Sequence, residues 1–207
     1  MTLGIDEIRT PQIEVEPPEQ YFAKMDISKE QKEERVKAAN DFMDVLLFFF
    51  AYLAIQMEYG GDLEVVYEEF TYRFGNVVRR YARMDEYMEA YVRDVTNNIA
   101  ELTVESLEVE WYTSSDRATA IGENEANSVL NYEELQAAID NGYRFKEWRS
   151  ERDNKVRKDH VTMDGRKIPI DEYFVFPDCM MLAPHDEVNG TARQICGCRC
   201  SLSYSRD

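Results

Sequence analysis

Apolar side chains recur every three or four positions between residues 66 and 102, and this spacing predicts a helix with one buried stripe. The stripe consists of Val66, Phe70, Phe74, Val77, Tyr81, Met84, Met88, Tyr91, Val95, Ile99 and Leu102. No proline lies within this stretch of sequence, and Gly75 costs only about 1 kcal/mol relative to alanine. The pattern therefore predicts one unbroken helix of about ten turns, with the stripe as its packing seam.

A second helix is predicted before this one, over residues 28–59. Ser28 and Gln31 fit a capping box at its start. Residues 42–57 are apolar on nearly every side, so they have to be enclosed by their own domain or by another chain. The longest apolar run, residues 45–55, is short of the roughly 20 residues that span a bilayer. This favours a buried helix and no membrane.

The two predicted helices are separated by Gly60-Gly61, and Asp62 is placed to cap the second one. Two long helices joined by such a break should fold back on each other as a helical hairpin. We therefore expect residues 28–112 to form a hairpin suited to docking against other subunits.

The first 27 residues differ in character from this hairpin. Pro11, Pro17 and Pro18 lie in an acidic setting, which disfavours helix and predicts an extended acidic arm over residues 1–27. The first residues lack the basic and apolar regions of a secretory signal, so we expect synthesis in a cytoplasm.

The sequence changes again near residues 113–116, where we place a domain boundary. Helical pieces are expected from Asp116 to about residue 126 and over 131–141, with Gly142 at a left-handed C-terminal position. Short strands are expected over residues 143–148, 167–170, 174–176 and 200–204, with an Asp164-Gly165 turn. The fold class is thus α+β, with a small mixed domain at 113–207.

Charge limits the classes of partner. The chain has 24 Lys and Arg against 41 Asp and Glu, a net charge of -17, which argues against nucleic-acid binding by the whole surface. Residues 143–167 are locally basic, with nine basic and five acidic side chains. This patch could contact a nucleic-acid backbone or an acidic partner, or could pair with the acidic helices of the same chain. The candidate DNA contacts are Arg144, Lys146, Arg149, Arg152, Lys155, Arg157 and Lys158.

Cysteine placement suggests a metal. All four cysteines, Cys179, Cys196, Cys198 and Cys200, lie in the last 29 residues, and without an export signal such clustering favours thiols or a metal over disulfides. If residues 196–200 are extended, the three thiols face one side. Zinc takes four ligands at about 2.0–2.3 Å, and a Cys-x-Cys pair binds it only where the backbone turns. Cys179, His160 and His185 are candidates for the further ligands, and buried apolar thiols are the alternative.

Enzyme motifs are largely missing from the sequence. It contains no phosphate-binding loop, no Gly-x-Ser-x-Gly and no His-Glu-x-x-His. His160 beside Asp159, with Glu125 upstream, is the one acid–base grouping that could be assembled. We therefore expect no enzyme.

The C-terminal half contains an ordered set of elements: Arg117, Ala118, Ile121, Glu125, Gly142, Lys146, Trp148, Arg157-Lys158-Asp159-His160, Asp164-Gly165, Ile170-Asp171, Phe174, Pro184 and Cys198-Arg199-Cys200. In this order and spacing it resembles the phage Mu F-like minor head proteins, also called head-morphogenesis proteins. The resemblance covers residues 117–200 and leaves 1–112 outside.

This resemblance implies a minor capsid component of a phage head, in the virion, acting in head assembly beside the portal or inner capsid. The implied partners are portal or major capsid proteins, in a multimeric particle, and no catalytic site is implied. The alternatives are a metal-dependent enzyme or toxin-like effector packaged in the head, and a DNA-contacting head protein.

Two departures from the family pattern bear on a metal site. Gly197 stands where the family usually has Asn, and Cys179 and Cys196 look like additions. His160, Cys198 and Cys200 carry over as candidate ligands. With Cys179 as a fourth ligand particular to this protein, they form the candidate metal site, for which zinc is the ion considered.

Overall fold

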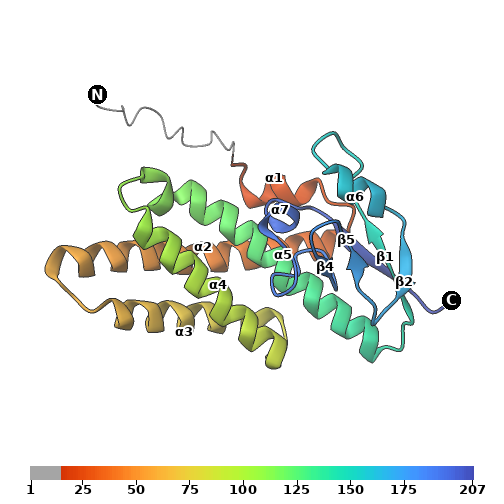
Figure 1. The fold of residues 1–207 in the computed structure, drawn as a ribbon, viewed down its shortest axis with the longest axis horizontal. Coiled ribbons are helices and arrows are strands. Elements are labelled where there is room, and N and C mark those ends of the chain that lie inside the picture. The colour runs from red at the N-terminus through yellow and green to blue at the C-terminus, as the bar shows by residue number, and fades with distance from the viewer. Residues whose placement is uncertain (1–14) are drawn as a thin grey trace.

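The structure is a computed structural model, and it describes residues 15–207. Its helices are α1 (Pro18–Ala23), α2 (Lys29–Tyr59), α3 (Leu63–Tyr81), α4 (Glu86–Glu105), α5 (Ser115–Asp140), α6 (Lys158–Met163) and α7 (Ala192–Ile195), with a 3-10 turn η1 (Glu110–Thr113). The strands are β1 (Phe145–Arg149), β2 (Lys167–Pro169), β3 (Phe174–Val175), β4 (Met180–Met181) and β5 (Ser201–Ser205). Long helices fill most of the molecule and the short strands gather at one end (Figure 1), which confirms the α+β class.

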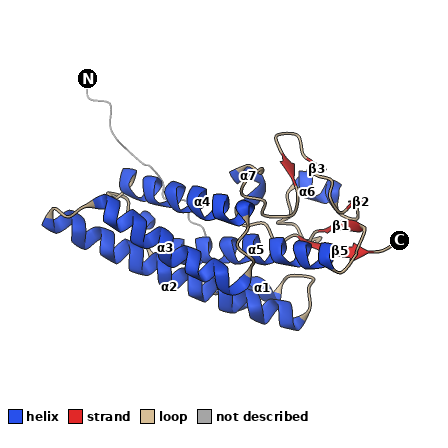
Figure 2. Ribbon diagram, turned by 90° about the horizontal axis from the view of Figure 1, so that it is seen from below, coloured by secondary structure: helices blue, strands red, loops and turns tan. Residues whose placement is uncertain are grey.

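The first part of the expected hairpin is confirmed. Ser28 and Gln31 form the capping box of α2, and Asp62 caps α3 by accepting a hydrogen bond from the Glu64 amide. Between them, Gly60 takes a left-handed φ of +69°, a conformation that glycine adopts without a Cβ penalty. The chain reverses there, and α3 packs back along α2 (Figure 2).

The second predicted helix is not continuous, so the prediction of an unbroken helix over residues 66–102 was wrong. Ala82 is extended, with φ -144° and ψ 157°, and Asp85 caps a new helix by accepting from the Met88 amide at 3.0 Å. Arg83 is fixed in the break because its backbone amide and guanidinium both donate to Glu133 of α5. The apolar spacing continues across the break because α3 and α4 both turn their stripes toward the same core.

The prediction of an extended arm over residues 1–27 was also wrong where the structure describes it. Residues 18–23 form α1, because proline at the first helical position lacks only an amide that would be unpaired anyway and its fixed φ already suits a helix. Phe22 of α1 and the following Met25 are buried in the main core. Residues 1–14 lie outside the described residues.

After η1, one long helix replaces the two expected pieces. Helix α5 is capped by Ser114, whose hydroxyl accepts from the Arg117 amide at 3.1 Å, and it runs unbroken to Asp140. Gly142 follows with a φ of +74°, as predicted. Most of α5 packs into the core formed by α1 to α4, and Leu135 near its end joins the core of the strand region. The division into domains at residue 113 remains a prediction.

The strand region has two small antiparallel sheets. In the first, β1 lies between β2 and β5; in the second, β3 pairs with β4. Trp148 of β1 is fully buried at the centre of this region and contacts Phe174 and Phe176 edge-on. The Asp164-Gly165 turn before β2 is present, with a Gly165 φ of +77°.

Helix α2 is long and apolar enough to cross a membrane by length and composition, the one such helix in the part of the chain that the structure describes. Its inner face is a core face, since Phe42, Leu46, Phe49 and Leu53 are fully buried against the neighbouring helices. Core helices pass the same length and composition test, and packing accounts for the apolar residues of this inner face. Leu47, Phe48 and Ile55 on its outer side are exposed.

Candidate metal centre

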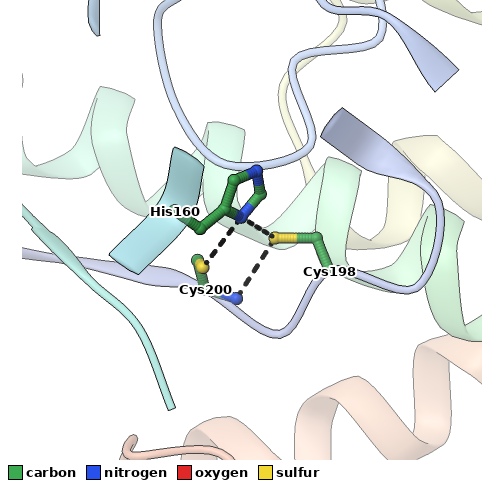
Figure 3. Close-up of side chains that lie close together, drawn as sticks. All are labelled: His160, Cys198 and Cys200. Atoms are coloured by element: carbon green, nitrogen blue, oxygen red, sulfur yellow. Dashed lines mark hydrogen bonds between the residues drawn. The ribbon is translucent and has the colours of Figure 1, made fainter. Parts of the chain in front are cut away.

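His160, Cys198 and Cys200 bring their ligand atoms together in the strand region (Figure 3). His160 is on α6, and the two cysteines are on the segment that leads into β5. All three ligand atoms lie within 4.8 Å of one another. The residues are 1%, 3% and 2% exposed, so the cluster is sealed from solvent.

A backbone turn produces this cluster. Gly197 has a left-handed φ of +66°, and the Cys198 amide donates back to the Ile195 carbonyl at 3.0 Å. The Cys200 amide in turn donates to the Cys198 sulfur at 3.4 Å. The chain therefore curves around the Cys198 thiol, which is the turn that a Cys-x-Cys pair needs to bind one ion. The same turn leaves Cys196 exposed, so the three thiols of the expected extended stretch do not share one side.

The hydrogen bond at Nε2 of His160 determines which of its two ring nitrogens carries the proton. Its Nε2 lies 3.0 Å from Oε1 of Gln194, and the Gln194 amide nitrogen donates to both Asp159 and Asp178. The amide nitrogen of Gln194 is thereby fixed toward the two carboxylates, and the side-chain oxygen of Gln194 accepts a hydrogen bond from His160. Nε2 thus carries the proton, and Nδ1 turns its lone pair toward the sulfurs. Outer hydrogen bonds of this kind orient histidine ligands in metal sites.

The spacing of the three atoms suits a tetrahedral ion. Nδ1 of His160 lies 3.3 Å from the Cys200 sulfur and 3.4 Å from the Cys198 sulfur. Zn–N bonds of about 2.0 Å and Zn–S bonds of about 2.3 Å, at tetrahedral angles, separate N and S by about 3.5 Å. These two edges therefore already have nearly the length that a zinc site requires.

The two thiols differ in acidity. Burial by itself raises the pKa of Cys198, but a hydrogen bond from the Cys200 thiol acts against burial, and the Cys198 pKa lies well below its ordinary value. The Cys200 pKa is raised, first by its hydrogen bond to Cys198 and then by burial. The pair thus shares one proton and one negative charge, as a thiolate beside a thiol. Thiolate is the form that binds metals.

An apolar shell surrounds the cluster. Trp148 and Phe176 each meet the His160 ring edge-on, with ring centroids 5.4 Å away. These contacts restrict the imidazole and keep water out. Because a catalytic metal needs an open coordination position that substrate can reach, a closed pocket of this kind suits a structural metal.

Cys179 does not join the cluster. It lies between β3 and β4, half-buried, and its backbone carbonyl accepts from the Phe176 amide at 2.9 Å. Within residues 15–207, the group of ligand atoms that could share an ion contains His160, Cys198 and Cys200 and leaves Cys179 out. Three of the four predicted ligands are therefore brought together.

The comparisons with known proteins identify the family. A family model described as "Phage Mu protein F like protein" matches residues 81–203, more than half of the chain. The chain belongs to the phage Mu protein F-like family. No curated protein and no solved structure matches it. The match confirms the resemblance found in the C-terminal half, and it begins earlier than expected, at the end of α3, so that it also includes α4.

Two residues of the Mu F-like pattern are buried and donate hydrogen bonds that connect parts of the fold. Arg117 is buried, and its guanidinium donates to Thr103 and to the Tyr112 carbonyl. Lys146 is fully buried, and its ammonium donates to the Leu182 carbonyl at 2.8 Å. Because Lys146 lies inside the protein, listing it among surface DNA contacts was wrong. The sequence could have indicated this burial, because residues two apart in a strand face the same side and Lys146 shares the buried face of β1 with Trp148.

The other basic residues of residues 143–167 largely have partners. Arg149 pairs with Glu147, Arg152 with Asp164, and Lys155 with Glu16, while Arg157 donates to the Cys196 carbonyl. Arg144 and Lys158 are exposed. Ion pairs and hydrogen bonds within the chain therefore neutralise or occupy much of the positive charge of residues 143–167.

Sequence reasoning missed a second chemical feature of this Mu F-like protein, a cavity of about 710 Å³ between α1, α4, α5 and α7. Four carboxylates line it: Glu16, Glu123, Glu125 and Glu187. Burial is the main cause that raises the pKa of Glu123 and of Glu187 to about 8, and it also raises that of Glu125. Glu125 accepts from Tyr91 and Asn124, whereas the ring nitrogens of His160 contact Gln194, Cys198 and Cys200. The two residues of the acid–base grouping considered from sequence therefore have separate hydrogen-bond partners. Glu187 lies 62 residues from Glu125, and no spacing in the sequence connects them.

Proposed function

We propose that this protein is a minor head protein that acts in the head assembly of a phage, docking against portal or capsid subunits through the α2–α3 end of the helical part. Membership of the Mu F-like family supports the phage assignment. The observation that carries the docking role is a group of exposed apolar side chains on α2 and α3. The turn that joins these two helices lies at the end of the molecule away from the strands (Figure 1).

The docking surface consists of Phe48 and Tyr52 on α2 and Val65 and Tyr72 on α3, with Glu68 and Glu69 beside them. They line a shallow groove of about 410 Å³. Tyr72 is 64% exposed and Val65 48%, an unusual exposure for neighbouring apolar side chains. The arrangement of apolar centre and acidic border fits a partner surface that is apolar with basic residues around it.

The rest of the molecule is consistent with a structural role. The ligand cluster is buried, and the acidic helices disfavour contact with packaged DNA. The location that follows is the phage head or an assembly intermediate of it. DNA contact through exposed cations such as Arg144 and Lys158 remains the alternative. It predicts binding that weakens steeply with salt.

Phage particles test the proposal. Mass spectrometry of purified heads and assembly intermediates should detect the wild-type protein, and absence from both would contradict the head assignment. A Phe48→Ser, Tyr72→Ser double variant should fold normally by circular dichroism and be lost from the particles.

Tyr173→Ser is the matched control, because Tyr173 is 43% exposed but lies on the strand region. It should enter particles like the wild type. Equal incorporation of the double variant and the control would contradict docking through α2 and α3 while leaving the head assignment intact.

A further inference from the structure

The cavity between α1, α4, α5 and α7 combines apolar walls with carboxyl groups. Its volume of about 710 Å³ lies within the roughly 300–1,000 Å³ of sites that hold small organic molecules. Helix α4 and η1 supply an apolar wall that consists of Val95, Ile99, Leu102 and Trp111. Glu123 and Glu125 come from α5, and Glu187 comes from the loop after β4. A molecule in this cavity therefore meets hydrocarbon and acidic groups together.

Glu123 is a buried acceptor in the lining of this cavity that lacks a donor. The residue is 6% exposed, and within residues 15–207 its buried Oε1 has no hydrogen-bond partner. Oδ1 of the next residue, Asn124, is also buried without a partner in that part of the chain. Native proteins rarely leave such atoms unsatisfied. Both atoms are acceptors, so a ligand that satisfies them has to donate hydrogen bonds.

The basic side chains of the lining have acceptors other than these three glutamates. The pairs are Lys24 and Lys155 with Glu16, Arg199 with Asp153, and Arg117 with the Thr103 hydroxyl and the Tyr112 carbonyl. Nη1 of Arg199 has no partner within residues 15–207, but Asp153 balances its charge through Nη2 at 2.6 Å. Glu123, Glu125 and Glu187 are thus acidic groups whose countercharge the lining does not supply.

Glu125 and Glu187 form one acidic point of the cavity. The Asn124 amide nitrogen donates to Oε1 of Glu125 at 3.2 Å and to Oε1 of Glu187 at 2.7 Å, so the two carboxyls flank a single amide. The loop that carries Glu187 is fixed by hydrogen bonds that join Asp186 to the Leu182 amide and the Tyr87 hydroxyl, and His185 to the Cys198 carbonyl.

Glu123 belongs to a second, separate acidic point. It is two residues from Glu125 on α5, and side chains two apart on a helix do not face each other. Within residues 15–207, the group of ligand atoms close enough to share one metal ion consists of His160, Cys198 and Cys200, and it includes none of these glutamates. A single ion therefore does not bridge the two acidic points. A ligand that meets both has to be extended and to carry a donor near each end.

We propose that this cavity binds a linear aliphatic diamine or polyamine. One ammonium group donates to Glu123 and another to the pair of Glu125 and Glu187, while the methylenes between them lie on the apolar wall of α4. An ammonium group has three donors and no acceptor, which matches the unpaired acceptors of the lining. It also supplies the positive charge that a buried carboxylate requires. The cavity is separate from the docking surface on α2 and α3, so the inference does not depend on the proposed head function.

Titration calorimetry on the full chain tests the inference, with cadaverine as the diamine and Mg²⁺ as an ion of equal charge without methylenes. The net charge of -17 attracts any cation, so the titrations belong at about 0.15 M salt, where exposed charges are screened. We expect saturable binding of one cadaverine per chain that equimolar Mg²⁺ does not displace. Absence of saturable binding, or displacement by equimolar Mg²⁺, would overturn the site.

A Glu123→Gln variant removes one acidic point and keeps the shape of the side chain. Its affinity for cadaverine should fall by about 10-fold or more, as loss of a hydrogen bond to a charged group implies. Glu64→Gln on α3 is the matched control, because it removes the same charge from an exposed position outside the cavity. The control should bind cadaverine as the wild type does. Equal affinities in Glu123→Gln and Glu64→Gln would show attraction by net charge alone and would contradict the proposal.

Discussion

Nε2 of His160 lies 3.0 Å from Oε1 of Gln194, and this hydrogen bond determines which nitrogen of the imidazole faces the two thiols. Asp159 and Asp178 hold the glutamine amide in the required orientation from the other side. A polar network of four residues thus supports a cluster that is otherwise enclosed by aromatic rings.

Gln194→Ala should therefore weaken metal binding without removing a ligand. We expect the affinity for Zn²⁺ to fall by about 10–100-fold, because Nδ1 loses its fixed tautomer and direction. Nitrogen-15 NMR of the metal-free chain should show His160 protonated at Nε2 in the wild type and a mixture of tautomers in the variant. A metal-free wild type protonated at Nδ1 would contradict the arrangement.

Stability should depend on pH through Glu187. Burial, and after it the charge of Glu125, raises the pKa of Glu187 to about 8, so the folded chain keeps a proton that the unfolded chain has already released. The resulting stabilisation is full below pH 4.5 and is lost as the pH rises through about 8. The wild type should unfold at a lower temperature at pH 8 than at pH 5.

Glu187→Gln should reduce this loss, because a glutamine oxygen still accepts from Asn124 and carries no charge. Melting temperatures at the two pH values should differ less in the variant, with a residual slope from Glu123. The exposed Glu110→Gln serves as control and should keep the wild-type slope. If the melting temperature of Glu187→Gln depended on pH as strongly as that of the control, this would contradict a raised pKa of the Glu187 carboxyl.

Arg35 joins α2 to α5 through a buried polar network. Its guanidinium is fully buried and donates to Glu134, Asn127 and Asn131. Arg35→Ala removes the cation beside Glu134 and the donor to the Asn127 and Asn131 oxygens, and it should lower the free energy of unfolding by about 3–5 kcal/mol, measured by urea denaturation. Lys29→Ala on the same helix removes an exposed pair with Glu33 and should change it by less than about 1 kcal/mol. Similar losses of unfolding free energy in Arg35→Ala and Lys29→Ala would contradict a stabilising role of the buried Arg35 network.

Trp148 is the central side chain of the strand region. It packs against Phe174, Phe176 and His160, with centroids 5.1 to 5.4 Å away. Trp148→Ala should cost about 3–5 kcal/mol in the free energy of unfolding. Trp111 in η1 is only partly buried, so Trp111→Ala should cost clearly less in the same measurement. A larger loss of unfolding free energy in Trp111→Ala than in Trp148→Ala would contradict the central position of Trp148.

The sequence alone predicted the features that depend on neighbouring residues. The Ser28 capping box, the Asp62 cap and the Gly60 reversal are decided by the hydrogen bonds and dihedral preferences of a few consecutive residues. The family pattern in the C-terminal half was readable for a similar reason, since its motifs lie in order along the chain.

Other features depended on contacts between distant residues, and only the tertiary structure decided them. The break after α3 depends on Arg83 meeting Glu133, 50 residues later. The exclusion of Cys179 and the approach of His185 to Cys198 follow from the turn at Gly197 and from the loop held by Asp186. Burial of Lys146 required the Leu182 carbonyl as its acceptor. Spacing along a chain sets local geometry, whereas which side chains share one buried volume is set by how the helices and sheets pack.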